Sequence, residues 1–237
     1  MSAARGVYIT GTDTGIGKTF VSCALLHALR SEGLRAVGMK PVASGCERID
    51  EGWRNDDALR LLAASDPQPD YALVNPYALP APTAPELAAR DVGVEVSLPP
   101  LRVAFEALTA VADFVVVEGV GGWAAPLSPR LDQCDLVHAL ELPVVLVVGL
   151  RLGCINHARL SARAIRIDGV QLLGWIGSVI DPEFARCAET VAILDRCIQA
   201  PRLGLLPHHA DAPGCAVELS DAAIRIRDFR QGGAWLK

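Results

Sequence analysis

One glycine-rich segment, residues 11–19, constrains the fold of this chain more than any other feature of its sequence. It reads Gly-Thr-Asp-Thr-Gly-Ile-Gly-Lys-Thr and stands between a short β-branched run at 7–10 and apolar residues at helical spacing over 18–30. A strand, a glycine-rich turn and a helix in this order form a phosphate-binding loop, because the glycines let successive backbone amides face one anion. The sequence therefore predicts a phosphate site at the start of the helix.

The end of this segment supplies the groups that a nucleotide needs. Lys18 offers a charge to the β- and γ-phosphates, and the hydroxyl of Thr19 is a ligand for Mg²⁺. The spacing departs from the common G-x-x-x-x-G-K-[ST] pattern, since five residues rather than four separate Gly11 from Gly17. A glycine-rich turn that only begins a helix is the alternative, and the Gly-Lys-Thr ending disfavours it.

The rest of the chain alternates strand-like and helical patterns. Predicted strands cover 36–39, 114–117, 144–148, 172–180 and 203–206, and predicted helices cover 56–64, 101–111, 153–167 and 183–198. This alternation predicts an α/β fold of the P-loop NTPase kind, a parallel sheet with helices on both faces. A length of 237 residues allows one or two domains at ~150 residues each. No linker interrupts the pattern, so we expect a single domain over residues 1–237, with the proline-rich stretch 75–85 as a surface loop.

Composition excludes several classes of protein. Hydrophobic residues make up 51% of the chain and charged residues 21%, which rules out disorder as the main state. A net charge of -5 argues against wholesale binding to nucleic acid or to an anionic membrane. No apolar stretch approaches the ~20 residues of a membrane span. Seven scattered cysteines without a CxxC pair, and no signal-peptide pattern near Arg5, predict a cytoplasmic protein with reduced thiols.

Two charged residues at predicted strand ends accompany the phosphate loop. Glu118 follows the buried run 114–117 and precedes a Gly-Val-Gly-Gly segment, the place where open α/β folds put a carboxylate directed at Mg²⁺. Lys40 follows the strand at 36–39, and Pro41 stops further strand pairing there. Each residue alone also fits a solvated charge at the end of a strand. Beside the phosphate loop, the two together favour nucleotide chemistry.

Five blocks of sequence occur in a specific order along the chain: Gly11-Thr-Asp-Thr with Gly17-Lys-Thr, Lys40-Pro-Val-Ala-Ser-Gly, Arg54-Asn with Asp57-Ala, Val117-Glu-Gly-Val-Gly-Gly-Trp, and Leu152-Gly-Cys-Ile-Asn-His. In order and spacing they resemble the dethiobiotin synthetase family over residues 11–157, and more weakly to Pro207. The resemblance implies an ATP- and Mg²⁺-dependent ligase that joins CO₂ to 7,8-diaminononanoate, giving dethiobiotin, ADP and phosphate in biotin synthesis. In that family a substrate amine carries CO₂ as a carbamate, which takes the γ-phosphoryl group to become a carbamic–phosphoric anhydride. The second amine then closes the ring, so no nucleophilic side chain is required.

The resemblance also implies roles for individual residues. The predicted Mg²⁺ ligands are Thr19, Asp57 and Glu118. The predicted catalytic residues are Lys18, Lys40 and Thr14, and the two lysines would neutralise the phosphates and the carbamate. The implied ATP-binding set is Gly15, Ile16, Gly17, Lys18, Thr19, Phe20, Asp57, Glu118, Gly119, Val120, Gly121, Ser178, Val179, Leu206, Pro207 and His208.

The substrate is expected to reach across two subunits. By the resemblance, Ser44 would contact it, and the turn that opens the helix at 153–167 would receive its carboxylate across a homodimer interface. The residues of that turn are Gly153, Cys154, Ile155 and Asn156.

Two positions depart from the family pattern. Ser178 stands where an Asn usually reads the adenine, and a serine lacks the paired donor and acceptor of an amide. Selectivity for adenine is therefore open, and other triphosphates are candidates. Thr190 falls where the partner subunit often supplies a Tyr to the substrate tail, which leaves selectivity for the tail equally open.

The main alternative is a nucleotide-driven switch ATPase of the ParA and MinD kind, which binds a protein partner or a membrane. Those proteins carry a signature lysine four residues before the last glycine of the loop, and Asp13 stands at that place here. A carboxylate cannot supply the charge of that lysine, so the ligase is the preferred interpretation.

Overall fold

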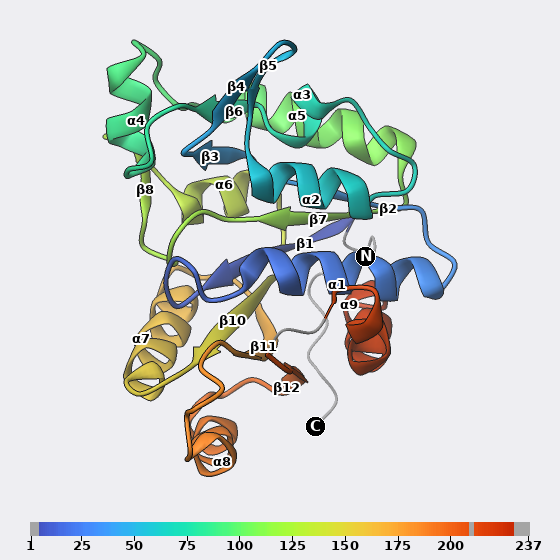
Figure 1. The fold of residues 1–237 in the computed structure, drawn as a ribbon, viewed down its shortest axis with the longest axis vertical. Coiled ribbons are helices and arrows are strands. Elements are labelled where there is room, and N and C mark those ends of the chain that lie inside the picture. The colour runs from blue at the N-terminus through green and yellow to red at the C-terminus, as the bar shows by residue number, and fades with distance from the viewer. Residues whose placement is uncertain (1–4, 209–210, 230–237) are drawn as a thin grey trace.

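The computed structural model, which describes residues 5–208 and 211–229, places the predicted strands side by side in a six-stranded parallel sheet (Figure 1). The strand order is β12-β11-β10-β1-β7-β2. The strands are β1 (Gly6–Gly11), β2 (Ala36–Met39), β7 (Phe114–Glu118), β10 (Val144–Leu150), β11 (Leu172–Val179) and β12 (Arg202–Leu206). The phosphate-loop strand β1 is central, and Val7 pairs with Val116 on one side while Tyr8 pairs with Val144 on the other.

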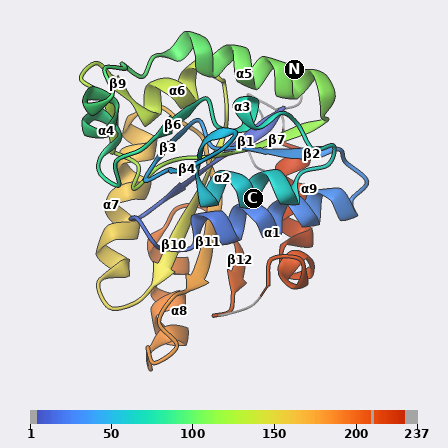
Figure 2. The ribbon, with the colours of Figure 1, turned by 45° about the horizontal axis from the view of Figure 1, so that its top comes forward.

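Helices cover both faces of this sheet because its central strands are apolar on both sides. One face packs against α1 (Lys18–Ser31), α2 (Asp56–Ala64), the 3₁₀ turn η1 (Gly214–Leu219) and α9 (Ser220–Arg227). The other face packs against α5 (Leu98–Val111), α6 (Gln133–Ala139), α7 (Cys154–Ile167) and α8 (Cys187–Cys197). Figure 2 shows α1 and α2 on one side of the sheet and α5 and α6 on the other. The predicted doubly covered α/β fold is confirmed.

The starts of two helices differ from the prediction by more than one residue. α5 begins at Leu98 rather than at residue 101, because Pro99 and Pro100 occupy the first turn, where no amide needs a helical acceptor. α8 begins at Cys187 rather than at residue 183, because Asp181 holds the preceding residues in a turn through the backbone N–H of Glu183.

The proline-rich stretch 75–85 is more than the predicted surface loop. It contains β6 (Tyr77–Leu79), which pairs in parallel with β3 (Val42–Ser44), and α4 (Pro85–Asp91) begins at its end. Asn75 is buried at 3% exposure, and its side-chain amide donates to the carbonyl oxygen of Lys40 at 2.7 Å. This tertiary contact fixes a segment that its prolines mark only as irregular.

The structure also contains small elements that the sequence patterns did not predict. They are the hairpins β4 (Glu47–Ile49) with β5 (Gly52–Arg54) and β8 (Pro126–Ser128) with β9 (Leu131–Asp132), and the short α3 (Tyr71–Val74). All seven cysteines are free thiols. Across the described residues, no helix combines the length and the apolar character that crossing a membrane requires.

Candidate active site

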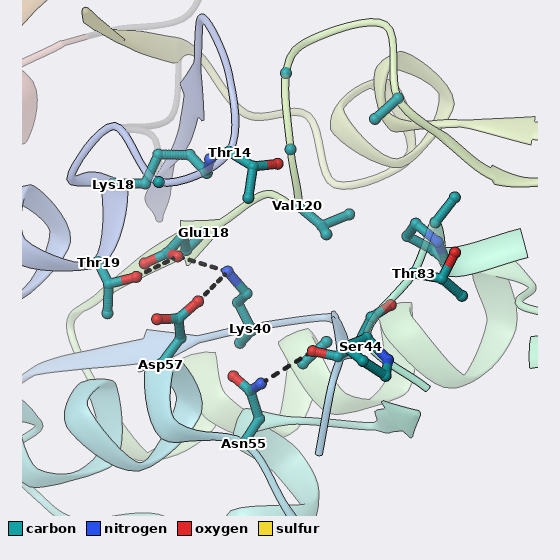
Figure 3. A pocket seen from close by; sticks show the side chains of 18 of the residues that line it. Thr14, Lys18, Thr19, Lys40, Ser44, Asn55, Asp57, Thr83, Glu118 and Val120 are labelled. Atoms are coloured by element: carbon teal, nitrogen blue, oxygen red, sulfur yellow. Dashed lines mark hydrogen bonds and ion pairs between the residues drawn. The ribbon is translucent and has the colours of Figure 1, made fainter. Parts of the chain in front are cut away.

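The carboxyl ends of β1, β2 and β7 lie at one edge of the sheet, and a cavity of about 850 Å³ opens beside them (Figure 3). Ligands of open α/β folds bind at this edge. The structure brings many of the predicted residues to this one cavity, although the chain supplies them from segments far apart. The predicted residues that line it are Thr14, Gly15, Gly17, Lys18, Thr19, Phe20, Lys40, Ser44, Asp57, Glu118, Val120 and Gly121.

The phosphate loop joins β1 to α1 through two glycines in the left-handed region. Gly15 has φ 70° and Gly17 has φ 89°, a conformation that other residues adopt only at a cost. Gly17 caps α1, and its carbonyl oxygen accepts the backbone N–H of Val21 at 3.0 Å. The amides at the start of α1 therefore point toward the cavity without partners from a preceding turn, as an anion site requires.

Lys18 folds back over the phosphate loop. Its Nζ donates to the carbonyl oxygen of Asp13 at 2.7 Å, and the side chain is 6% exposed. Burial lowers the pKa of Lys18 to about 8, with the nearby ammonium of Lys40 as the next cause. An anion bound to the loop would oppose both effects and favour the charged form of Lys18.

Asp13 fixes the phosphate loop to the neighbouring strand. One carboxylate oxygen accepts the backbone N–H of Thr14 at 2.8 Å, and the other forms an ion pair with Arg151, just after β10, at 2.7 Å. Asp13, which stands where switch ATPases carry their signature lysine, therefore stabilises the loop without lining the cavity.

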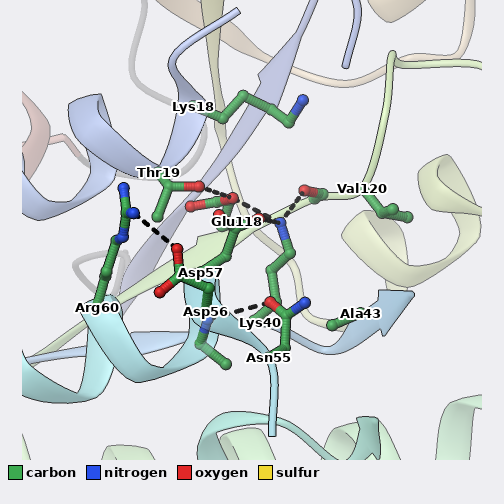
Figure 4. A network of polar contacts seen from close by, with 12 residues as sticks. Lys18, Thr19, Lys40, Ala43, Asn55, Asp56, Asp57, Arg60, Glu118 and Val120 are labelled. Carbon is green, nitrogen blue, oxygen red and sulfur yellow. Dashed lines mark hydrogen bonds and ion pairs between the residues drawn. The ribbon is translucent and has the colours of Figure 1, made fainter. Parts of the chain in front are cut away.

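A second cluster of charges lies under the loop, where β2, β7 and α2 meet (Figure 4). The ammonium of Lys40 donates to Oε1 of Glu118 at 2.6 Å, to Oδ2 of Asp57 at 3.1 Å and to the carbonyl oxygen of Gly119 at 3.2 Å. The hydroxyl of Thr19 donates to the same Oε1 of Glu118 at 2.8 Å. The cluster therefore connects the start of α1 to the ends of β2 and β7 and to the first turn of α2.

Burial and charge act in opposite directions in this cluster. Burial by itself would lower the pKa of Lys40, but the carboxylates of Glu118 and Asp57 outweigh it, and the pKa is raised. Burial likewise opposes ionisation of Asp57, and the Lys40 ammonium with the Thr19 hydroxyl holds its pKa below the ordinary value. Lys40 is therefore a permanent cation at neutral pH, placed between two carboxylates.

Glu118 has the features of a metal ligand. It is fully buried (0% exposed), and its Oε2 has no hydrogen-bond partner among the described residues. A buried carboxylate oxygen without a partner is costly unless a cation or water satisfies it. Thr19 and Asp57 stand beside it, and Mg²⁺ typically takes one or two carboxylates together with hydroxyl, water and phosphate oxygens. The residues present therefore fit such an ion, whereas the described part of the chain has no group of three or more His, Cys, Asp or Glu suited to a metal.

Comparison with known proteins identifies the family. A profile described as an AAA domain matches residues 5–213. The ATP-dependent dethiobiotin synthetase of Xanthomonas oryzae pv. oryzae (strain PXO99A) is 65% identical over 209 residues, which cover 88% of this chain and 93% of that protein. The corresponding protein of Xylella fastidiosa (strain 9a5c) is 65% identical over 201 residues, covering 85% and 89% of the two chains. The chain belongs to the dethiobiotin synthetase family.

Solved structures of the alternative class share the fold. The MinC:MinD cell division protein complex of Aquifex aeolicus matches with a TM-score of 0.59 and 13% identity, over 99% of both chains. A ParA family ATPase from Chlorobium tepidum matches with a TM-score of 0.56 and 13% identity, over 94% and 93% of the two chains. At this identity the likeness concerns the fold alone, and the family assignment comes from the dethiobiotin synthetases.

Some residues that line the cavity had no role predicted from the sequence. Asn55 precedes α2, and its side chain accepts the backbone N–H of Ala58, which sets the start of the helix that carries Asp57. An Asn before a helical pattern is a recognisable cap, so this residue had a usable signal. Arg60 and Thr83 also line the cavity, and no local pattern distinguishes them from surface residues.

The predicted ATP-binding residues at the ends of β11 and β12 are not among those that line the cavity. Ser178 is 4% exposed and backs onto Gly17, so closely that a Cβ on Gly17 would overlap its hydroxyl. His208 contacts the carbonyl oxygen of Val179 at 3.1 Å through Nδ1. Leu206 and Pro207 lead to this contact at the end of β12.

Two further residues of the predicted ATP-binding set, Ile16 and Gly119, direct no side chain into the cavity. The side chain of Ile16 is buried in the core at 1% exposure, so only its main chain faces the loop. Gly119 offers its carbonyl oxygen to Lys40. The N–H of Gly119 donates to the carbonyl oxygen of Ile9 at 2.9 Å, so both polar backbone groups of this glycine have partners within the chain.

The turn at residues 153–156, which was predicted to receive the substrate carboxylate, lies outside this cavity. Gly153 has φ 93° and begins α7, and Cys154 is buried at 3% exposure. None of the predicted residues Gly153, Cys154, Ile155 and Asn156 is among those that line the cavity. Leu152, just before the turn, is 90% exposed. Thr190, the expected tail contact, is buried in α8 at 6% exposure, which leaves that side chain little surface for another subunit's substrate.

Proposed function

We propose that the cavity at the ends of β1, β2 and β7 is where this chain closes the ureido ring of dethiobiotin from 7,8-diaminononanoate, CO₂ and ATP. The chain is an ATP-dependent ligase of biotin biosynthesis, as its family membership establishes. The observation that carries the proposed site is the position of Lys40. Its buried ammonium lies in the same cavity as the phosphate loop, within hydrogen-bond distance of two carboxylates.

The two lysines are suited to different parts of the reaction. Lys18 belongs to the phosphate loop, so we propose that it binds the β- and γ-phosphates of ATP. Lys40 lies deeper and is held by Glu118 and Asp57, so we propose that it faces the carbamate and the transferred γ-phosphoryl group. Negative charge grows on these oxygens as the anhydride forms, and fixed cations in a site with little water stabilise it strongly. Thr14, at the rim of the cavity, is proposed to orient the reacting groups.

We further propose that Thr19, Asp57 and Glu118 hold Mg²⁺. The unpartnered Oε2 of Glu118 supports this assignment. When bound, Mg²⁺ would neutralise phosphate charge and orient ATP. The ammonium of Lys40 and the hydroxyl of Thr19 both donate to Oε1 of Glu118, so its other carboxyl oxygen is the one proposed to meet the ion.

The diamine is proposed to lie against Ser44, whose hydroxyl is buried without a partner among the described residues and lines the cavity. Its two amines are the nucleophiles, first toward CO₂ and then toward the anhydride. The chain then has to bind and orient the substrates and to exclude water from them. The segment of Pro82 and Thr83, which lines the cavity, favours the exclusion of water.

The assembly and setting are proposed as well. We propose a homodimer in which the start of α7, with the exposed Leu152 beside it, meets the cavity of a second subunit and receives the substrate carboxylate. The helix amides there are suited to an anion. We propose a single domain over residues 1–237 and a cytoplasmic location, which the free cysteines favour.

ADP release tests the proposed function against a switch ATPase. The protein with Mg²⁺ and ATP is expected to release ADP only when both the diamine and bicarbonate are present. Nonanoate is the matched control, because it lacks both amines and cannot form the carbamate that takes the γ-phosphoryl group and releases ADP. ADP release that proceeds at the same rate without diamine and bicarbonate would refute the ligase assignment and favour a nucleotide switch.

A further inference from the structure

Gln133 is the first residue of α6 and lies beneath the loop that follows β7, with 0% of its surface exposed. Its Oε1 accepts hydrogen bonds from the hydroxyl of Tyr8 at 2.7 Å and from the backbone N–H of Val120 at 3.0 Å. Its Nε2 donates to the carbonyl oxygens of Gly122 and, at 3.4 Å, Trp123. The partners are donors at one end of the amide and acceptors at the other, so one orientation satisfies all four.

The peptide group between Gly119 and Val120 is held from both sides. Its N–H points to Gln133, and its carbonyl oxygen accepts from Nζ of Lys40 at 3.2 Å. The N–H and C=O of a trans peptide point in opposite directions. A rotation of this plane would therefore turn an N–H toward the ammonium of Lys40 and remove one of its acceptors.

We infer that Gln133 is a positioning residue for the ligase reaction, because it fixes the Gly119–Val120 peptide with its carbonyl oxygen toward Lys40. This inference rests on the proposed role of Lys40. Val120 and Gly122 separate Gln133 from the cavity and line it themselves, so Gln133 acts through the backbone rather than on the substrate. The same contacts hold the cavity wall formed by Val120, Gly121 and Gly122.

Tyr8 and Gly119 complete the support for this amide. The Tyr8 hydroxyl projects from β1, and burial, with the carboxylate of Glu118 as the next cause, raises its pKa well above the ordinary value. It therefore remains a hydrogen-bond donor to Gln133 at any pH at which the enzyme works. A Cβ on Gly119 would lie 2.6 Å from this hydroxyl, so only glycine lets the two side chains approach the peptide.

The test compares variants at position 133 in the full-length enzyme. Gln133→Leu removes all four hydrogen bonds, and we expect kcat for ring formation to fall about tenfold while KM for ATP stays within about twofold. Ser65→Ala is the control for lost stability. Ser65 is buried away from the cavity, accepts the N–H of Gly38 at 2.9 Å and donates to the carbonyl oxygen of Leu61. It should lower thermal stability and leave kcat unchanged.

Gln133→Glu gives a second measurement, the pH dependence of kcat relative to wild type, which a purely structural role would not change. One carboxyl oxygen can still accept from Tyr8 and Val120, but the other faces the carbonyl oxygens of Gly122 and Trp123 and must carry a proton to bond them. Burial favours that proton, so the variant should be within about threefold of the wild-type kcat near pH 6 and should fall progressively behind it toward about pH 9.

Few charged groups face this position. On α6 and its cap, Asp132 and Asp135 are exposed at the helix start, and burial raises the pKa of the Cys134 thiol. From β1, the Tyr8 hydroxyl faces Gln133, and its raised pKa keeps it protonated. From β7 and β2, Glu118 and Lys40 lie on the far side of the Gly119–Val120 peptide. The change of kcat ratio with pH therefore reports the new carboxyl group itself.

The outcomes separate this inference from the proposed function. A wild-type enzyme that forms no ring product would refute the proposed function and not concern Gln133. With an active wild type, a Gln133→Leu variant with unchanged kcat, or a Gln133→Glu variant whose kcat ratio to wild type is constant with pH, would overturn the positioning role. A Gln133→Leu loss together with a pH-dependent Gln133→Glu ratio supports it, and the glutamate variant alone decides if the leucine variant does not fold.

Discussion

Replacing Lys40 with methionine should separate the stability of the fold from the chemistry of the site. The side chain of Lys40 is 4% exposed and that of Glu118 is 0% exposed, with 2.6 Å between Nζ and Oε1. At an effective dielectric constant of ~20 this distance corresponds to an attraction of roughly 6 kcal/mol, most of which offsets the desolvation of the two charges. Removing one partner of such a buried pair typically costs about 3–5 kcal/mol, because the remaining charge has no compensation.

The two partners do not depend on each other equally. Without Lys40, Glu118 keeps only the hydroxyl of Thr19 among its described partners, whereas without Glu118, Lys40 keeps Asp57 and the carbonyl oxygen of Gly119. Glu118→Gln should therefore cost less, about 1–2 kcal/mol. The double variant Lys40→Met/Glu118→Gln removes both charges and should be about 2 kcal/mol more stable than Lys40→Met alone.

Urea unfolding followed by tryptophan fluorescence measures these free energies, and ring formation followed by mass spectrometry measures turnover. Lys40→Met and the double variant should both lose turnover by about 10²–10³-fold, while ATP affinity changes by less than about threefold, because Lys18 and the loop amides remain. A loss of less than about 1 kcal/mol of stability in Lys40→Met would contradict the proposed buried pairing. A double variant no more stable than Lys40→Met, or a Lys40→Met enzyme that retains turnover, would contradict it as well. Loss of ATP binding in Lys40→Met would mean that Lys40 binds the nucleotide rather than the carbamate.

Three further predictions concern the nucleotide. Because burial and Lys40 lower the pKa of Lys18 to about 8 in the free protein, bound phosphates should raise it again. ATP binding should then take up a proton near pH 8.5 and almost none near pH 6.5, which titration calorimetry in two buffers of different ionisation enthalpy measures. With Ser178 in place of an amide, kcat/KM for GTP and CTP should lie within about tenfold of the value for ATP, and a hundredfold preference for ATP would show that another group reads the base. Mg²⁺ at about 100 times its dissociation constant should stabilise the ATP complex by about 2.7 kcal/mol, and EDTA or Glu118→Gln should abolish that gain in a thermal shift assay while leaving metal-free ATP binding intact.

The central parts of the fold and site were predictable because they follow from residue type at fixed places. Glycines with Lys18 between a strand and a helix specify a phosphate loop, and the ends of parallel strands meet at one edge, so Lys40 and Glu118 had to lie near it. Their pairing follows from burial, because a buried ammonium and a buried carboxylate are each costly without an opposite charge.

The walls of the cavity were not predictable by the same reasoning. Thr83 reaches it because β6 pairs with β3 and because Asn75 bonds the main chain of Lys40, contacts that link segments about which the local pattern carries no information. Gln133 shows the same limit more sharply. Its place at the start of a short helix is unremarkable, and its importance arises from four partners on other elements.

Incorporation of labelled bicarbonate is the direct test that this chain forms the ureido ring of dethiobiotin. The purified protein is incubated with Mg²⁺, ATP, 7,8-diaminononanoate and ¹⁴C-bicarbonate, and the mixture is then acidified, which expels free CO₂ and decomposes carbamates. We expect acid-stable label in a ring product, formed in equal amount with ADP and missing when ATP or the diamine is left out. Label that is lost entirely on acidification, although the protein is folded and binds ATP, would contradict that assignment.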